Sequence, residues 1–98
     1  MSGLRFAWDQ RKAAANLRKH GVSFTEAQAV FADEHAVLID DPDHSATEQR
    51  FILLGTGLSG RLLVVSHGYR ADDELIRVIS ARKADHRERQ AYQERERR

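Results

Sequence analysis

The stretch RFILLGTGLSGRLLVVSHGYRADDELIRVISA, residues 50–81, decides the fold. Its apolar runs at 50–55, 61–67 and 74–81 are short and bounded by turn residues, which predicts three strands. The connections between these runs are short. Short connections favour antiparallel neighbours, because a parallel pair needs a crossover of roughly a dozen residues or more. A further strand is predicted at 36–39, just before a turn rich in Asp and Pro.

Two helices are predicted ahead of these strands. Asp9 is a suitable N-cap for a helix over 10–20, and Gly21 provides a left-handed stop. The pattern S-F-T-E at the start of 23–32 is a capping box, in which Glu26 would reach back to the N-cap backbone. Because the link between the two helices is so short, they form an αα-hairpin.

The two ends of the chain complete the predicted fold. At residues 4–8 the large apolar side chains Leu4, Phe6 and Trp8 fall on one face, which predicts a short strand. Residues 83–96 predict a polar helix. The order is β-α-α-β-β-β-β-α. It indicates an α+β fold in which an antiparallel sheet carries the αα-hairpin on one face and the C-terminal helix as a further cover. We expect one domain over 1–98, with Trp8, Phe24 and Phe31 in its core.

Composition excludes several classes of protein. The chain has no cysteine, which excludes disulfide scaffolds and thiolate metal sites and favours a reducing compartment. It shows no apolar run long enough to span a bilayer and no signal-peptide core, so a cytoplasmic protein is expected. The net charge is +1, but residues 82–98 carry a net +3 and the remainder a net −2. This basic end is compatible with local binding of a polyanion, or with a solvated helix laced with ion pairs.

The sequence does not predict a metal or nucleotide cofactor. The five histidines are scattered, and the Asp-rich turn at 40–43 lacks the alternation of a calcium loop. The motif GTGLSG at 55–60 is followed by a strand, whereas a dinucleotide-binding loop opens a helix. We therefore expect a protein without a cofactor.

Cationic side chains gather on the late strands. Arg70, Arg77 and Arg82 would converge if these strands are antiparallel neighbours, and guanidinium groups match phosphate oxygens in geometry. Nearby, His67 could exchange protons and Tyr69 could stack on an RNA base. The first predicted helix could provide a second basic wall, through Lys12, Arg18, Lys19 and His20. In the alternative interpretation, Arg77 forms a scaffold ion pair with Glu48, Asp72 or Glu74.

Beyond these patterns, the chain resembles a known family. The segment NLRKHGVSFTEA at 16–27, after Trp8-Asp9, is similar to the N-terminal half of the BrnT family. The segment IRVISARKA at 76–84, after GRLLVV at 60–65, is similar to the C-terminal half of that family. The resemblance runs in order over nearly the whole chain. It implies a RelE-like fold and the toxin half of a bacterial type II toxin–antitoxin system.

The resemblance also implies an activity and partners. It implies metal-independent cleavage of RNA that inhibits translation. It further implies neutralisation by a DNA-binding BrnA-like antitoxin, usually in a dimer of heterodimers. On this basis we expect Arg70, Arg77 and Arg82 to clamp the phosphate, with Lys19 as a further cation and His67 as the acid–base group. Arg50, which matches the family's EXR pattern, is a further RNA-binding candidate.

Two other classes of function remain open at this stage. The chain could be a non-catalytic module that binds an antitoxin and acts as a corepressor. It could also be a nucleic-acid-binding domain without activity, although its nearly neutral charge disfavours that interpretation.

Overall fold

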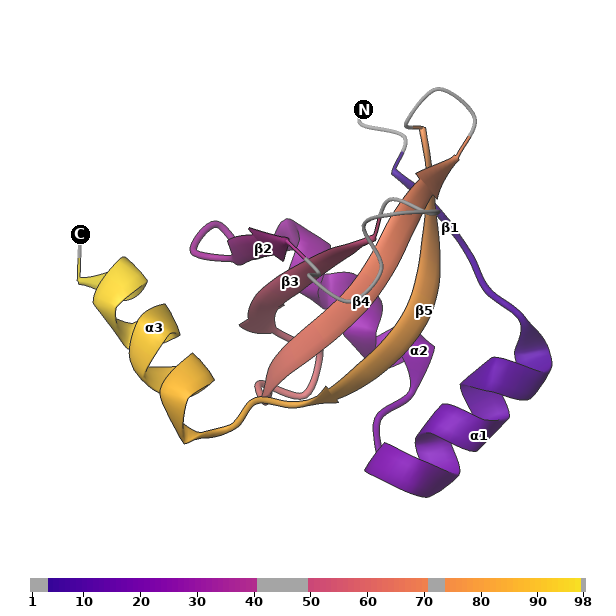
Figure 1. Cartoon of the computed structure of the whole chain (residues 1–98), viewed down its shortest axis with the longest axis horizontal. Helices are drawn as coiled ribbons and strands as arrows, with labels where there is room; N and C mark the ends of the chain where they lie inside the picture. The colour runs from indigo at the N-terminus through magenta and orange to yellow at the C-terminus, as the bar shows by residue number, and fades with distance from the viewer. Residues whose placement is uncertain (1–3, 41–49, 71–73, 98) are drawn as a thin grey trace.

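The computed structural model describes residues 4–40, 50–70 and 74–97. A five-stranded sheet lies at its centre, with the strand order β1-β5-β4-β3-β2 (Figure 1). The strands are β1 (Arg5–Ala7), β2 (Val37–Asp40), β3 (Phe51–Thr56), β4 (Leu62–Arg70) and β5 (Leu75–Lys83). The helices are α1 (Gln10–His20), α2 (Phe24–Ala27), the 3₁₀ helix η1 (Gln28–Ala32) and α3 (His86–Glu96). The predicted α+β class and the predicted order of elements are confirmed.

The sheet is antiparallel except at one edge. β2, β3, β4 and β5 pair in antiparallel fashion along the chain, as their short connections predict. β1 instead pairs with β5 in parallel. The rule for short connections does not apply to this pair, because the helices α1, α2 and η1 and the strands β2, β3 and β4 lie between the two strands in sequence.

The helical hairpin is confirmed in outline and differs in detail. The Asp9 carboxylate accepts hydrogen bonds from the backbone N–H groups of Arg11 and Lys12, at 2.8 and 3.2 Å. Gly21 ends α1 with a φ of 69°, the left-handed conformation predicted for it. The predicted second helix is α-helical for only four residues and continues as the 3₁₀ helix η1. The third helix starts later than predicted, at His86, because β5 continues to Lys83.

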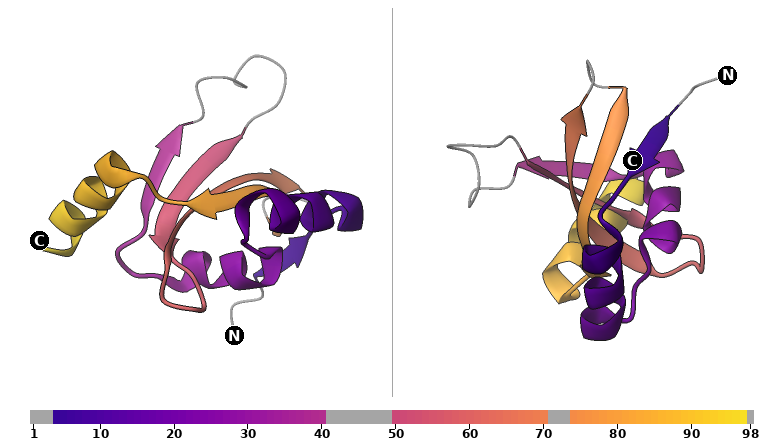
Figure 2. Two further views of the ribbon diagram at one scale, coloured as in Figure 1. Left: turned by 90° about the horizontal axis from the view of Figure 1, so that it is seen from below. Right: turned by 90° about the vertical axis from the view of Figure 1, so that its right-hand side faces the viewer.

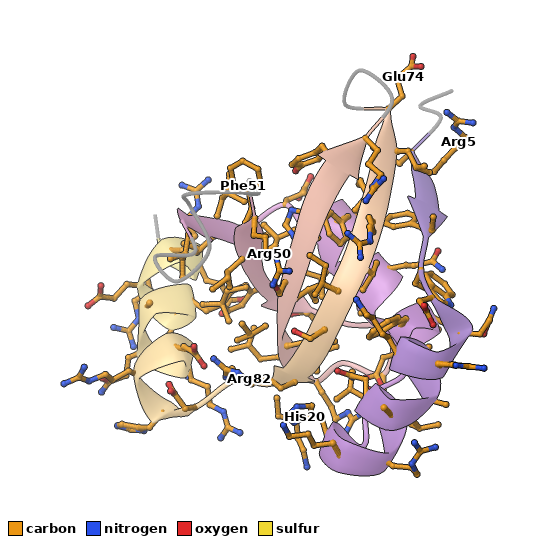
Figure 3. All side chains as sticks on the ribbon, turned by 45° about the vertical axis from the view of Figure 1, so that its right-hand side comes forward. Arg5, His20, Arg50, Phe51, Glu74 and Arg82 are labelled. Carbon is orange, nitrogen blue, oxygen red and sulfur yellow. The ribbon has the colours of Figure 1, made fainter. Side chains whose placement is uncertain are left out.

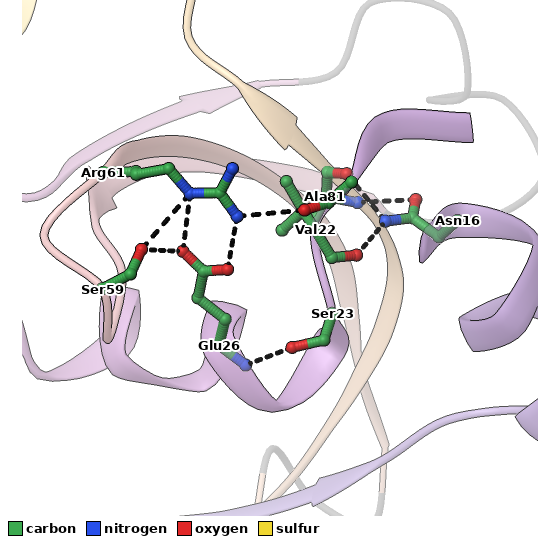
Figure 4. A network of polar contacts seen from close by, with 8 residues as sticks. Asn16, Val22, Ser23, Glu26, Ser59, Arg61 and Ala81 are labelled. Atoms are coloured by element: carbon green, nitrogen blue, oxygen red, sulfur yellow. Dashed lines mark hydrogen bonds and ion pairs between the residues drawn. The ribbon is translucent and has the colours of Figure 1, made fainter. Parts of the chain in front are cut away.

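The predicted capping box at the start of α2 is only half formed. Ser23 Oγ accepts from the Glu26 N–H at 3.0 Å, but the Glu26 carboxylate does not reach back (Figure 4). It binds Arg61 instead, with Nη2 to Oε1 at 2.6 Å and Nε to Oε2 at 3.1 Å, and it accepts from the Ser59 hydroxyl. Arg61 also donates to the Gly21 carbonyl at 3.0 Å. The β3–β4 loop is thereby fastened to the corner between α1 and α2, and the Arg61 hydrogen bond lowers the pKa of the Glu26 carboxyl.

The two faces of the sheet carry separate apolar clusters. Successive residues of a strand point to opposite faces, so Leu63 and Val65 pack under α2 and η1 while Val64 packs against Tyr92 of α3. Figure 2 shows the ribbons of these helices around the sheet. Phe24 is buried in the first cluster, and Trp8 and Phe31 are half-buried against it, in agreement with the predicted core. The second cluster includes Tyr92 of α3 and Ala84, which precedes that helix.

One buried side chain fastens α1 to the sheet. β1 ends opposite Arg77, so it does not pair with the part of β5 around Ala81. The Asn16 side chain occupies that place. Its Oδ1 accepts from the Ala81 N–H at 3.1 Å, and its Nδ2 donates to the carbonyls of Ala81 at 2.8 Å and Val22 at 2.9 Å. A single amide side chain thus replaces a neighbouring strand.

Asn16→Ala should therefore destabilise the fold strongly. The substitution leaves the buried N–H and C=O of Ala81 and the carbonyl of Val22 without these partners, so we expect a loss of roughly 2–4 kcal/mol in the free energy of unfolding. Urea denaturation followed by circular dichroism measures it. Gln10→Ala, which removes an exposed amide from the same helix, is the control and should change stability by less than about 0.5 kcal/mol. Equal effects of the two substitutions would contradict the role of Asn16.

Candidate active site

Five arginines share the sheet face on which α3 packs, which we call the arginine face. Residues directly opposite each other in neighbouring strands point to the same face. Arg82 lies opposite Val64 of the α3-side cluster, Arg77 lies opposite Gly68, and Arg70 lies opposite Leu75. Arg5 is also paired with Leu75, and Arg50 precedes β3 two residues before Ile52 of the same cluster. Figure 3 shows Arg50 over the middle of the sheet and Arg82 at its end next to α3.

A β-bulge brings Arg77 and Arg82 to the same face. They are five residues apart on one strand, so regular alternation would send them to opposite faces. The pairing of β4 with β5 passes from Ser66 opposite Ser80 to His67 opposite Val78, which leaves Ile79 as an extra residue. The alternation of β5 is reversed at that point. The sequence predicts that these arginines converge, but it does not reveal the bulge that brings Arg77 and Arg82 to one face.

Arg50, Arg70 and Arg77 surround the glycine at position 68. Arg70 is a diagonal neighbour of Arg77 across the strand pair, a relation with a Cα separation of roughly 7–8 Å. Continuing the β3–β4 pairing by one residue puts Arg50 opposite Gly68, on the side away from Arg77. Because Gly68 has no side chain, β4 places none between Arg50 and Arg77 at this position. Long arginine side chains in this arrangement can approach one phosphate.

Arg82 is engaged with α3. Its Nη1 and Nη2 donate to Oε1 and Oε2 of Glu88, each at 2.9 Å, in a bidentate pair. Glu88 Oε1 also accepts from the Asp85 N–H at 2.8 Å and so completes a capping box at the start of α3. Hydrogen bonding to Arg82 lowers the pKa of the Glu88 carboxyl. Arg82 thus forms a scaffold ion pair that fastens β5 to α3.

The prediction of His67 as an acid–base group at the arginines is wrong in its geometry. His67 points to the opposite face, where its exposure is 0% and its ring packs edge-on against Phe31 with a centroid distance of 4.8 Å. Its Nδ1 lies 3.2 Å from the Val65 carbonyl and its Nε2 lies 3.3 Å from the Tyr69 hydroxyl. Burial lowers the pKa of the His67 imidazole. In this structure the ring reaches neither the arginines nor solvent.

Tyr69 lies beside His67 and is 39% exposed. Its ring is 5.5 Å from that of Phe51 and 5.3 Å from that of His67, in an aromatic group that continues to Phe31 and Phe6. This group belongs to the face opposite the arginines. The structure therefore does not bring the predicted base-stacking tyrosine together with the predicted phosphate clamps.

The predicted basic wall lies on α1, at the β5 edge of the sheet, and Figure 3 shows His20 near the end of β5 that carries Arg82. α1 packs against the other face and the edge of β5, through Ala13 and Asn16. Lys12, Arg18 and Lys19 are exposed on this helix, and His20 is half-buried one turn after Asn16. Arg18, Lys19 and His20 lie in the last turn of α1. Positive charge at this position stabilises the helix, because the C-terminal end of the helix dipole is negative.

Residues that could bind a metal ion are not gathered in the described part of the chain. Across residues 4–40, 50–70 and 74–97, the structure has no group of three His, Cys, Asp or Glu side chains placed to hold an ion. The described helices include none long and apolar enough to cross a bilayer. Residues 41–43 of the turn predicted at 40–43, His44, Glu48 and Asp72 lie outside the described residues, and Asp40 is the last residue of β2.

Sequence reasoning missed Arg5 as a member of the arginine face. The signal was present, because the alternation that turns Phe6 inward turns Arg5 to the opposite face. The sequence does not reveal which strand pairs with β1. Only the parallel pairing with β5 puts Arg5 beside Leu75, and Leu75 in turn beside Arg70.

Comparisons with known proteins agree with this fold. A family model described as "Ribonuclease toxin, BrnT, of type II toxin-antitoxin system" matches residues 8–88. Among solved structures, the chain is similar to the ribonuclease toxin BrnT of Brucella abortus, with a TM-score of 0.65 and 23% sequence identity. The likeness covers 84% of this chain and 97% of that one. At this identity it shows the fold alone. None of the curated proteins matches the chain.

The buried His67 predicts a specific pH dependence of stability. Its folded-state pKa lies below the ordinary value of 6.5, so the unfolded chain binds a proton that the folded chain does not. The free energy of unfolding should be fully retained above about pH 6.5 and should fall as the pH drops below that value. In His67→Gln this component should be absent. Urea denaturation at several pH values between about 5 and 8 measures it.

His86→Gln is the matched control, since His86 is exposed at the start of α3. It should leave the pH dependence of the wild-type chain in place. If His67→Gln and the wild type lose stability in parallel as the pH falls, the account of His67 as a buried neutral group is wrong.

Proposed function

Because the chain belongs to the BrnT family of ribonuclease toxins of type II toxin–antitoxin systems, we propose that it cleaves RNA at the arginine face without a metal ion. The observation that carries this proposal is the placement of Arg50, Arg70 and Arg77 around Gly68 on adjacent strands. Cleavage of RNA in the cytoplasm would inhibit translation. A cation cluster of this kind is suited to a substrate whose reacting group is a phosphate.

The chemistry we propose is intramolecular transesterification. The 2′-hydroxyl oxygen attacks the adjacent phosphorus, a new P–O2′ bond forms and the P–O5′ bond breaks. The products are a 2′,3′-cyclic phosphate and a 5′-hydroxyl. The 2′-hydroxyl proton passes to water, and the departing 5′ oxygen takes a proton from water, so that atoms and charge balance. Negative charge grows on the phosphorane in between, and preorganised guanidinium groups stabilise it.

The arginines of the face have different roles in this proposal. Arg70 is exposed and Arg77 is half-buried, and both belong to the central strands that pair along their length. They clamp the reacting phosphate, and Arg50 binds it from the position just before β3. Arg82 holds Glu88 and thereby orients α3 at the border of the site. We propose no acid–base role for His67, because its ring is buried on the other face.

The partner that we propose is a protein antitoxin. A type II system pairs its toxin with a protein, and we propose a BrnA-like DNA-binding antitoxin encoded in the neighbouring reading frame. A dimer of heterodimers is the proposed assembly. Association with such a partner would restrain the ribonuclease until the antitoxin is lost.

Arg77→Ala tests the site. Loss of one charge donor from a preorganised site should lower the rate of RNA cleavage by about 10²–10³-fold, and Arg77→Lys, which keeps the charge without the fork, should retain part of it. Addition of EDTA should leave the wild-type rate unchanged. The measurements are cleavage of a defined RNA by purified protein and growth after induction of the chain alone. Circular dichroism verifies that each variant is folded.

Arg89→Ala is the matched control, because Arg89 is an exposed arginine on α3. It should cleave RNA at the wild-type rate. A folded Arg77→Ala protein with full activity would exclude the arginine face as the site. If the wild-type chain binds an antitoxin but leaves RNA intact, the chain is a non-catalytic corepressor module and the enzymatic proposal fails.

A further inference from the structure

A groove of about 350 Å³ lies between α1 and α2, on the side of the molecule away from the arginine face. Its floor is aromatic, with the rings of Trp8 and Phe24 in edge-to-face contact at 5.8 Å. One wall is the α1 stripe of Ala13, Ala14 and Leu17. In the structure, Leu17 remains 51% exposed, because Asn16 rather than Leu17 faces β5.

The border of this groove is basic. Helix α1 has four Lys and Arg residues and no Asp or Glu. Arg11 and Arg18 lie on the flank of α1 next to the groove stripe, seven residues apart, which is about 10 Å along a helix axis. Both side chains are exposed, and among the described residues no carboxylate forms an ion pair with either. Lys12 and Lys19 repeat the spacing on the side of α1 turned away from the groove.

We propose that this groove is the docking site for an acidic amphipathic helix of the antitoxin; this inference rests on the antitoxin partnership proposed above. Apolar side chains spaced three and four residues apart on that helix enter between Leu17 and the aromatic floor. Carboxylates on its flank, about two turns apart, pair with Arg11 and Arg18. An apolar anchor in a pocket with charges at the rim is the usual composition of a protein–protein interface.

The lining of the groove favours a protein over RNA. Binding of single-stranded RNA relies on exposed aromatic rings for stacking and on polar groups for the base edges. Here Trp8 is only half exposed at the floor, and the α1 wall offers the methyl groups of Ala13, Ala14 and Leu17. The polar side chains of the lining are those of Gln10, Ser23 and Thr25, and the Ser23 hydroxyl caps α2. Such a surface gains most from burial of apolar side chains, at roughly 25 cal/mol per Å² of apolar surface removed from water.

The test uses the full chain and the purified product of the neighbouring reading frame as the probe. Leu17→Gln removes the apolar wall at an exposed position, and Arg11→Glu/Arg18→Glu reverses the rim charges. Each should weaken binding of the antitoxin by at least about tenfold. Lys12→Glu/Lys19→Glu is the matched control, with the same spacing and the same change in charge. It should alter the affinity by no more than about twofold.

Trp8 provides a direct readout at the groove, since it is the single tryptophan of the chain. The toxin is labelled with fluorotryptophan, and its one fluorine resonance should shift when the antitoxin binds. Leu17→Gln should cleave RNA at the wild-type rate, because Leu17 lies apart from the arginine face.

The outcomes separate this inference from the proposed function. If the antitoxin does not bind the wild-type chain, the proposed partnership is wrong and the docking site is wrong with it. Equal binding to wild type and Leu17→Gln, or an unchanged Trp8 resonance in the complex, overturns the docking site and leaves the ribonuclease proposal standing. Loss of RNA cleavage in Arg11→Glu/Arg18→Glu with full antitoxin binding would identify α1 as an RNA surface and also overturn the inference.

Discussion

The extra residue in β5 determines what each face of the sheet can do. Before the bulge, Ile76 and Val78 point into the core while Arg77 points out; after it, Ala81 points into the core while Arg82 points out. Without the bulge, one of these two sets would be reversed, because a shift of one residue exchanges the faces of a strand. The same irregularity therefore keeps the inward-facing side chains of β5 apolar from Ile76 to Ala81 and puts both arginines on one face.

Side chains hold this strand where the backbone alone cannot. Just after the bulge, Ala81 turns its N–H and C=O toward an edge that β1 is too short to cover, and the Asn16 amide satisfies both. At the opposite edge of the sheet, a side chain again takes the place of a neighbouring strand. Thr56 of β3 extends past the first residue of β2, and its N–H donates to Asp33 Oδ2 at 2.8 Å. Short edge strands are thus completed by polar side chains from the helical layer.

The sequence was sufficient for local structure and insufficient for long-range pairing. The span of α1, its Asp9 cap and its Gly21 stop follow from neighbours in the chain, and all three are confirmed. The parallel pairing of β1, the partner of Glu26 and the burial of Asn16 depend on residues distant in sequence, so no periodicity reveals them. The site shows the same division. The shared face of the arginines was predicted, but His67 was assigned by proximity in sequence, and alternation along β4 sends it to the opposite face.

The position of the two proposed surfaces constrains how an antitoxin would inhibit the enzyme. The groove belongs to the helical layer and the arginines belong to the other face, so a helix seated against Leu17 leaves Arg70 and Arg77 uncovered. Inhibition by direct occlusion then requires a second segment of the antitoxin that passes the edge of β5. The groove would supply affinity, and an acidic segment following the docked helix would neutralise the guanidinium groups. Tethering makes such a second contact effective, because a linked segment is present at a high local concentration even when it binds weakly alone.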